Sequence, residues 1–158
     1  MNKFLNLFIV IFLVFSCKSD EDSSPSEQGL NNQTLNHDGV DRQYLQYIPD
    51  NYDGSTKLPL LLNFHGFGGN TNYFMQTADM RSLAESEGFV LVYPQGTDLN
   101  GSPHWNADLN GGDNKSSVDD LGFIEALINK LSNQNLIDNK RVYAIGYSNG
   151  GMMSYALG

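Results

Sequence analysis

The sequence predicts an α/β fold, in which a mostly parallel sheet is covered by helices on both faces. Three short, almost wholly apolar runs occupy residues 58–64, 89–93 and 142–145. Such runs are typical of strands that are buried on both faces, as in parallel sheets. Segments with a helical period separate the runs, and strands that alternate with helices favour a parallel sheet.

A β-hairpin is predicted before the first of these strands. Residues 33–36 and 42–48 form its arms, and Asp38-Gly39 between them is a strong signal for a tight turn. Pro49 ends the second arm.

Two helices are predicted between the apolar strands. The first is expected over residues 75–87, with Gly88 closing it. The second follows Ser117, a predicted N-cap with Asp120 three residues later. Its apolar residues recur at helical spacing at positions 121, 124, 128 and 131. Residues 95–116 are expected to form a long loop, and loops of that length are usually functional or mobile.

The charge balance argues against nucleic acid as a partner. The chain has 18 Asp and Glu against 9 Lys and Arg, and a formal net charge of −9. An acidic protein lacks the cations that neutralise a phosphate backbone. A phosphate loop would need a Gly-Lys-Ser/Thr ending, and the glycine-rich residues 65–69 have none. We expect no cofactor and no metal ion.

The chain begins with a segment, residues 1–16, that is typical of a secretory signal peptide. Lys3 supplies a positive charge, residues 4–15 are apolar except for Asn6, and Ser16 is a small residue before Cys17. The apolar run is shorter than the 20 or so residues that a membrane-spanning helix needs.

Cys17 is the only cysteine, so no intrachain disulfide can form. Residues 14–17, Val-Phe-Ser-Cys, resemble a bacterial lipobox, whose cysteine is lipidated and becomes the N-terminus. We therefore expect a secreted protein that a lipid on Cys17 anchors to the outer membrane. The alternative is an ordinary signal peptide with an incidental cysteine.

An acidic cluster follows Cys17 at residues 18–22. It resembles the surface-export signal of Bacteroidetes lipoproteins, which implies exposure at the cell surface. The alternative is a solvated tether. Residues 17–29 are polar with no apolar period, and we expect them to be disordered in either case.

Residues 146–150, Gly-Tyr-Ser-Asn-Gly, form a G-x-S-x-G motif between a predicted strand and an apparent helix. That context is typical of a nucleophile elbow, a tight turn that lifts the serine hydroxyl above the sheet. We expect Ser148 to be the nucleophile, and Gly146 and Gly150 to let the strand and helix approach closely. The alternative is a purely structural turn.

The glycine-rich residues 65–69, His-Gly-Phe-Gly-Gly, follow an earlier strand. A flexible loop in this place can aim backbone N–H groups at an oxyanion. We expect the two donors to be the N–H of Phe67 and the N–H of Asn149, the residue after the serine. The alternative is a plain strand-to-helix turn.

Five stretches, taken together and in order, resemble the polyhydroxybutyrate depolymerase and feruloyl esterase group of the α/β-hydrolases. They are NFHGFGGN, SEGFVLVYPQG, WNA, VDDLGFIEALI and RVYAIGYSNGGMMSYAL. The resemblance covers residues 33–158 and implies an α/β-hydrolase fold and hydrolysis of a carboxylic ester. It implies Ser148 as nucleophile and Phe67 as an oxyanion donor. Many members have cysteines where this chain has Phe67 and Ala107, so no disulfide is carried over.

Trp105 and Asn106 lie in the predicted long loop. The resemblance places them beside the active site, which implies contact with substrate. The alternative is a packing tryptophan.

No histidine and no acidic residue follows Ser148 in this sequence. A serine needs a base and an orienting carboxylate, and α/β-hydrolases have them in the chain order Ser, Asp or Glu, His. His37, His65 and His104 all precede the serine, so this order argues against each of them as the base. We therefore expect residues 30–158 to be the N-terminal part of a catalytic domain, and the chain to be inactive alone.

Three functions stay open at this point. The first is a serine ester hydrolase acting on polyhydroxyalkanoate, or on feruloyl or acetyl esters of plant polysaccharide. The second is a serine peptidase of the same fold, although its usual N-terminal propeller has no room here. The third is a non-catalytic surface lipoprotein that binds glycan or polymer, although the expected aromatic stripe is not evident.

Overall fold

A computed structural model describes residues 29–107 and 116–158 of the 158-residue chain. The predicted signal peptide, Cys17 and nearly all of the predicted tether lie outside the described residues. The main sheet has five strands: β1 (Leu30–His37), β2 (Val40–Tyr47), β3 (Leu58–Phe64), β4 (Val90–Pro94) and β7 (Ile137–Gly146). The helices are α1 (Thr71–Thr77), α2 (Arg81–Glu87), α3 (Asp120–Asn133) and α4 (Asn149–Ala156). A small separate hairpin consists of β5 (Thr97–Leu99) and β6 (Ser102–His104).

The main sheet has the strand order β1-β2-β4-β3-β7. Its three apolar strands, β4, β3 and β7, run parallel to one another, as predicted. β2 pairs antiparallel with β4, and the β1–β2 hairpin forms one edge. The hairpin turn is at Asp38 and Gly39, whose φ angles are 51° and 77°. Positive φ at both central residues is the geometry that Asp-Gly favours, so the predicted hairpin is confirmed.

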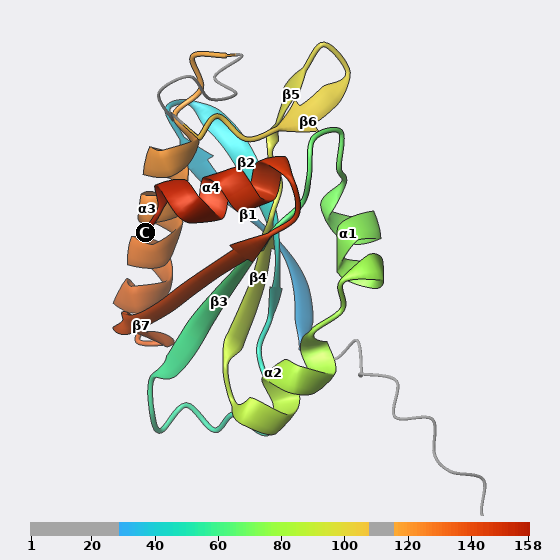
Figure 1. Ribbon diagram of the computed structural model, residues 1–158. Helices are drawn as coiled ribbons and strands as arrows, with labels where there is room; N and C mark the ends of the chain where they lie inside the picture. Colours follow the sequence, from blue (N-terminus) through green and yellow to red (C-terminus); the bar gives the residue numbers. More distant parts are fainter. Residues whose placement is uncertain (1–28, 108–115) are drawn as a thin grey trace, which may run out of the picture.

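Each face of the sheet carries its own core. Leu60, Leu62 and Phe64 alternate with Leu61 along β3, and the two sets belong to different clusters. The first cluster includes residues of α3 and α4, and the second includes residues of α1 and α2. Figure 1 shows these helix pairs on opposite sides of the sheet. Burial on both faces explains why β3 and β4 read as continuous apolar runs. The third run, residues 142–145, is not buried on both faces: Tyr143 is 57% and Ile145 39% exposed, because β7 lies at an edge of the described sheet.

The single helix predicted over residues 75–87 is wrong, because the structure has two short helices there. The chain leaves helical geometry between α1 and α2, at residues 78–80. The hydroxyl of Tyr93, from β4, donates to Ala78 O at 2.7 Å and accepts from Met80 N–H at 3.1 Å. This tertiary contact satisfies backbone groups that a continuous helix would have paired internally. Gly88 closes α2 in the left-handed conformation, as predicted.

The predicted N-cap Ser117 is also wrong, because Asp119 caps α3. Its side chain accepts from the N–H of Gly122 at 2.8 Å. Asp120 takes part in no capping box, because its carboxylate is buried against Arg42 of β2.

The predicted long loop over residues 95–116 contains the β5–β6 hairpin. Its turn is Asn100-Gly101, with φ angles of 54° and 85°. Asn-Gly is among the strongest local signals for such a turn, so this hairpin could have been predicted within the loop from the sequence alone.

In the described part of the chain, no helix is long and apolar enough to span a bilayer.

Candidate active site

Ser148 lies in the turn between β7 and α4. Its φ and ψ are 51° and −116°, and its side chain is exposed. These angles lie outside the regions that side-chain-bearing residues normally populate, so the surrounding structure must hold this conformation. The strained strand-to-helix turn is the geometry expected of a nucleophile elbow.

The two glycines of the motif are required by close backbone contacts. A Cβ at Gly146 would lie 2.3 Å from Gly150 O, and a Cβ at Gly150 would lie 2.3 Å from Phe64 O. Real Cβ atoms do not approach backbone oxygens so closely, so any larger residue would push α4 away from β3 or β7. The structure confirms that these glycines allow the strand and helix to approach.

The glycine-rich loop at residues 65–69 lies directly against this turn. The N–H of Tyr147 donates to Phe64 O at 3.1 Å, and a Cβ at Gly66 would lie 3.0 Å from the Tyr147 ring. The fold therefore brings together the loop of Phe67 and the turn of Ser148, which are about 80 residues apart in sequence.

Asn149 is the first residue of α4, so its N–H has no acceptor within its own helix. That amide sits at the positive end of the helix dipole. The Asn149 side chain is buried, and its Oδ1 accepts from Trp105 N–H at 2.7 Å. Asn149 Nδ2 donates to Trp105 O at 2.9 Å.

Trp105 and Asn106 are buried, which favours the packing alternative over substrate contact. The indole is 0% exposed, packs edge-on against Phe64 and donates from Nε1 to His65 O at 2.9 Å. The Asn106 side chain donates to the carbonyls of Ser116 and Val118.

His65 is held in a structural role. Its Nε2 accepts from Gly96 N–H at 2.9 Å, and its Nδ1 lies 2.7 Å from Gly66 O. Together these partners require the neutral tautomer with the proton on Nδ1. Burial lowers the pKa of the His65 imidazole, which favours the same neutral form.

The other two histidines also have partners elsewhere. His104 is buried, with Nδ1 near Thr97 O and Nε2 near Ser116 Oγ, both at 3.1 Å. His37 lies at the β1–β2 turn, 3.4 Å from Asp119 Oδ2. No hydrogen bond joins a histidine to Ser148 within residues 29–107 and 116–158.

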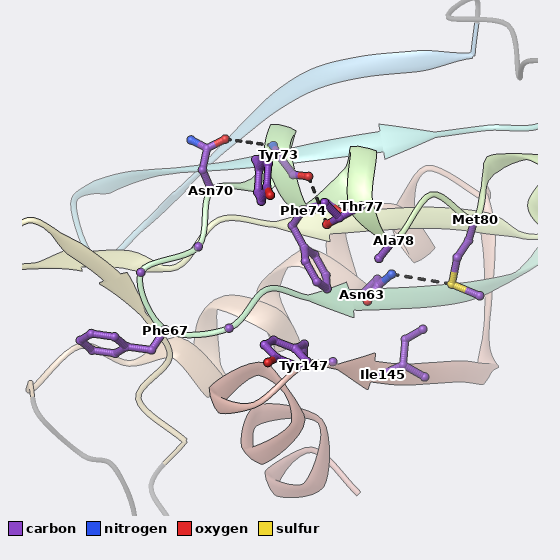
Figure 2. Close-up of a pocket in the computed structure, with 14 residues that line it drawn as sticks. Asn63, Phe67, Asn70, Tyr73, Phe74, Thr77, Ala78, Met80, Ile145 and Tyr147 are labelled. Carbon is purple, nitrogen blue, oxygen red and sulfur yellow. Dashed lines mark hydrogen bonds between the residues drawn. The ribbon is translucent and has the colours of Figure 1, made fainter.

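A cavity of about 850 Å³ opens beside the elbow. Figure 2 shows Tyr147 and Ile145 on one side of it and Tyr73, Phe74 and Thr77 of α1 on the other, with the loop of Phe67 at one end. Tyr73, Phe74, Ala78 and Met80 complete the mainly apolar lining. No sequence pattern predicts this cavity, because residues of the loop, α1 and β7 become neighbours only in the folded chain.

One group among the described residues has metal-ligand character. The ligand atoms of His37, Asp38 and Asp119 lie within 4.8 Å of one another, and both carboxylates are exposed. Asp119 already caps α3, and the group lies at the hairpin turn and not at the elbow. No sequence pattern groups these residues, because Asp119 is distant in sequence from the hairpin.

Residues 74–157 match the prolyl oligopeptidase family, over more than half of the chain and up to the residue before its end. The chain belongs to this family. The match to the prolyl oligopeptidase family begins within α1 and includes α2, β4, α3, β7 and the whole elbow with Ser148.

Curated relatives of this prolyl oligopeptidase-family chain are named as esterases. It is 36% identical over 117 residues to a bifunctional acetylxylan esterase/xylanase of Neocallimastix patriciarum, covering 74% of this chain and 16% of that protein. It is 31% identical over 116 residues to feruloyl esterase B of Thermothelomyces thermophilus, covering 70% of this chain and 37% of that protein. The chain therefore spans less than half the length of these relatives.

Solved structures establish the fold. The acetyl xylan esterase from Aspergillus awamori superposes with a TM-score of 0.61 at 19% identity, covering 80% of this chain and 46% of that one. A thermostable esterase gives the same TM-score and identity, covering 82% and 37%. The chain has the α/β-hydrolase fold predicted from its sequence.

Proposed function

We propose that the complete protein hydrolyses carboxylic esters with Ser148 as the nucleophile. The observation that carries the proposal is the strained backbone of Ser148, which presents an exposed hydroxyl at the start of α4. A structural turn would have no need of a side-chain-bearing residue in this conformation, since glycine adopts it without strain. The esterase names of the curated relatives support the reaction class.

The proposed reaction follows from the placement of these groups. Ser148 Oγ attacks the ester carbonyl carbon, and its proton passes to a general base. The N–H groups of Phe67 and Asn149 donate to the oxyanion of the tetrahedral intermediate. The intermediate then collapses with cleavage of the ester C–O bond, and the protonated base gives its proton to the departing alcohol. Water, deprotonated by the same base, attacks the acyl carbon, the acid leaves, and the base returns the proton to Ser148 Oγ.

The general base and its carboxylate partner belong to the complete protein. His65 and His104 have both ring nitrogens occupied, and α/β-hydrolases have their acid and histidine after the nucleophile. The chain spans 16% and 37% of the two relatives described above, so these groups are to be sought in sequence that follows Ser148.

The proposed substrates are acetyl or feruloyl esters of plant polysaccharide. The names of the relatives support this class, and the aromatic lining of the cavity beside the elbow suits a hydroxycinnamoyl group. Polyhydroxyalkanoate is the alternative polymer. Turnover of acetylxylan, methyl ferulate and polyhydroxybutyrate by the complete protein discriminates among these substrates.

The decisive test is Ser148→Ala in the complete protein. We expect kcat for 4-nitrophenyl acetate to fall by at least about 10³-fold, because the nucleophile is lost while the oxyanion donors remain. Ser86→Ala is the matched control, because Ser86 is exposed on α2. Retained hydrolysis in the Ser148 variant would refute the assignment.

Peptide hydrolysis is a second candidate, favoured by the match to the prolyl oligopeptidase family. The same nucleophile and oxyanion donors can act on an amide, so the elbow alone does not separate the two reactions. Proline-containing peptide 4-nitroanilides measured beside the esters make the distinction. Amide turnover that exceeds ester turnover in kcat/KM would favour the peptidase.

We also propose that a lipid on Cys17 anchors the protein to the outer membrane and that the acidic residues 18–22 direct it to the cell surface. Only the sequence supports this proposal, because Cys17 lies outside the described residues. Cys17→Ala should abolish labelling by an alkyne-tagged fatty acid and release the protein from the membrane fraction. Ser19→Ala is the control, and membrane retention of the Cys17 variant would contradict the anchor.

A further inference from the structure

Trp105 lies where the two halves of the proposed active site meet. The segment that follows β6 crosses the end of the sheet at which α4 begins (Figure 1). Trp105 is on this segment and is 0% exposed, so it is a buried neighbour of the elbow and not a surface for substrate.

On one side, Trp105 holds the elbow through its backbone. The Asn149 side chain accepts from Trp105 N–H at 2.7 Å and donates to Trp105 O at 2.9 Å. A two-bond contact of this kind constrains both the distance and the orientation of the side chain. The proposed oxyanion donor is the backbone N–H of the same residue, Asn149. Fixing the Asn149 side chain therefore also fixes the position of this N–H beside Ser148.

On the other side, Trp105 holds the glycine-rich loop through its indole. Trp105 Nε1 donates to His65 O at 2.9 Å, and the ring centroids of Trp105 and His65 are 5.1 Å apart. The His65 imidazole is fixed in turn by Gly66 O and by the N–H of Gly96. This chain of bonds reaches the residue before Phe67, the other proposed donor.

We propose that Trp105 and the Asn149 side chain form a clamp that sets the spacing of the two oxyanion donors. Trp105 is thus a positioning residue, since it acts through the amides of Phe67 and Asn149. The inference rests on the proposed ester hydrolysis for its catalytic consequence, but the clamp itself can be tested without turnover. Small displacements of such donors lower rates strongly, because an oxyanion hole works by preorganised geometry.

Trp105→Phe in the complete protein tests the indole bond. Phenylalanine keeps an aromatic ring beside Phe64 and His65, and it removes the N–H donor together with part of the buried indole volume. We expect kcat for 4-nitrophenyl acetate to fall about 10- to 100-fold with KM changed less than about twofold. Inhibition by a trifluoromethyl ketone, which forms a tetrahedral oxyanion on the serine, should weaken by a similar factor. Loss of folded enzyme alone would lower the apparent kcat at an unchanged KM, but it would leave the inhibitor's affinity for the remaining active enzyme unchanged.

Asn149→Ala tests the other arm of the clamp. Alanine keeps the backbone N–H that is the proposed donor, so a loss of kcat in this variant reports a change in position. Tyr47→Phe is the matched control, because it removes one buried hydroxyl that bonds Glu85 at 2.9 Å, between β2 and α2. The control variant should keep the wild-type kcat and inhibitor affinity.

Amide hydrogen exchange supplies the readout that does not depend on activity. Trp105→Phe and Asn149→Ala should each speed exchange in both residues 66–69 and residues 148–151, and Tyr47→Phe in neither. Unchanged exchange in those segments would overturn the clamp. Faster exchange with an unchanged kcat would overturn the positioning role. If the wild type hydrolyses no ester, the proposed function fails, and the exchange data still decide whether the clamp exists.

Discussion

Four residues other than glycine have a positive φ in the described part of the chain, and three of them are Asp38, Asn100 and Asn135. Asp and Asn tolerate the left-handed region, and the first two occupy hairpin turns. Ser148 is different in kind, because its ψ of −116° lies outside that region. The close backbone approaches at Gly146 and Gly150 flank it on both sides. At the scale of one residue, this conformation is the feature that points to chemistry.

A pH dependence of stability is expected from His65. Burial lowers its pKa in the folded state, whereas in the unfolded chain it titrates near the ordinary value of about 6.5. The unfolded state therefore binds a proton first as the pH falls, and the free energy of unfolding decreases from about pH 6.5 down to the lowered pKa. Urea unfolding at several pH values measures this slope, and His65→Gln should flatten it between about pH 6.5 and 5.

Asp79→Asn is the control variant for the pH dependence of the free energy of unfolding. Hydrogen bonds from Arg81 lower the pKa of the Asp79 carboxyl, so its stabilising contribution is present above about pH 4 and is lost below it. Asn at position 79 should therefore leave the slope between pH 6.5 and 5 unchanged. A slope that His65→Gln leaves intact would show that His65 is not its source.

At the scale of secondary structure, the break between α1 and α2 depends on one hydroxyl from another element. Tyr93 is fully buried, and its oxygen bonds both Ala78 O and the N–H of Met80. Asp79 adds a local contribution, because its carboxylate accepts from the N–H of Arg81 at 3.0 Å, at the start of α2. The two short helices are therefore a product of the sheet beneath them as well as of their own residues.

Removing that hydroxyl should destabilise the protein. Tyr93→Phe leaves two partly buried backbone groups, Ala78 O and Met80 N–H, without their partner, and we expect a loss of about 1–3 kcal/mol in the free energy of unfolding. Denaturant unfolding measures this loss, and amide exchange at residues 78–80 should become faster. Tyr73→Phe is the control, because that side chain is exposed on α1. Equal effects of the two variants would contradict a special role for Tyr93.

At the scale of the whole molecule, a buried ion pair joins the edge hairpin to the helix that covers the sheet. Arg42 of β2 donates to Asp120 Oδ1 at the start of α3, and both side chains are almost completely buried. Asp120 Oδ2 accepts from the N–H of Asn106 at 2.7 Å, next to Trp105. The guanidinium also lies 4.0 Å above the centroid of the Phe123 ring. The pair therefore connects the hairpin, α3 and the segment that supports the elbow.

Removing one partner of the Arg42–Asp120 pair should destabilise the protein by much more than the intact pair stabilises it. Arg42→Met leaves Asp120 charged and buried, and we expect a loss of about 3–5 kcal/mol in the free energy of unfolding. The double variant Arg42→Met, Asp120→Asn should recover part of the loss, because no buried charge remains. Arg141→Met is the control, because the Arg141–Asp138 pair lies at the surface and its loss should shift the denaturation midpoint little.

Much of the fold could be predicted because its signals are local. β3 spans residues 58–64, as its apolar run predicts, and Asp38-Gly39 predicts the hairpin turn. The strand–turn–helix context of Ser148 predicts the elbow. Errors arose where a distant residue decided the outcome. The α1–α2 break depends on Tyr93, and the role of Asp120 depends on Arg42, 78 positions earlier.

By itself, the sequence determined the strands of the main sheet, its edge hairpin and the motif at Ser148, because each depends on residues within a few positions of one another. Only the tertiary structure decided that Trp105 is buried and that its indole bonds the loop of His65. It also decided that the three histidines face other partners and that an apolar cavity opens beside the elbow. These properties arise from contacts between elements, and the packing of those elements sets them.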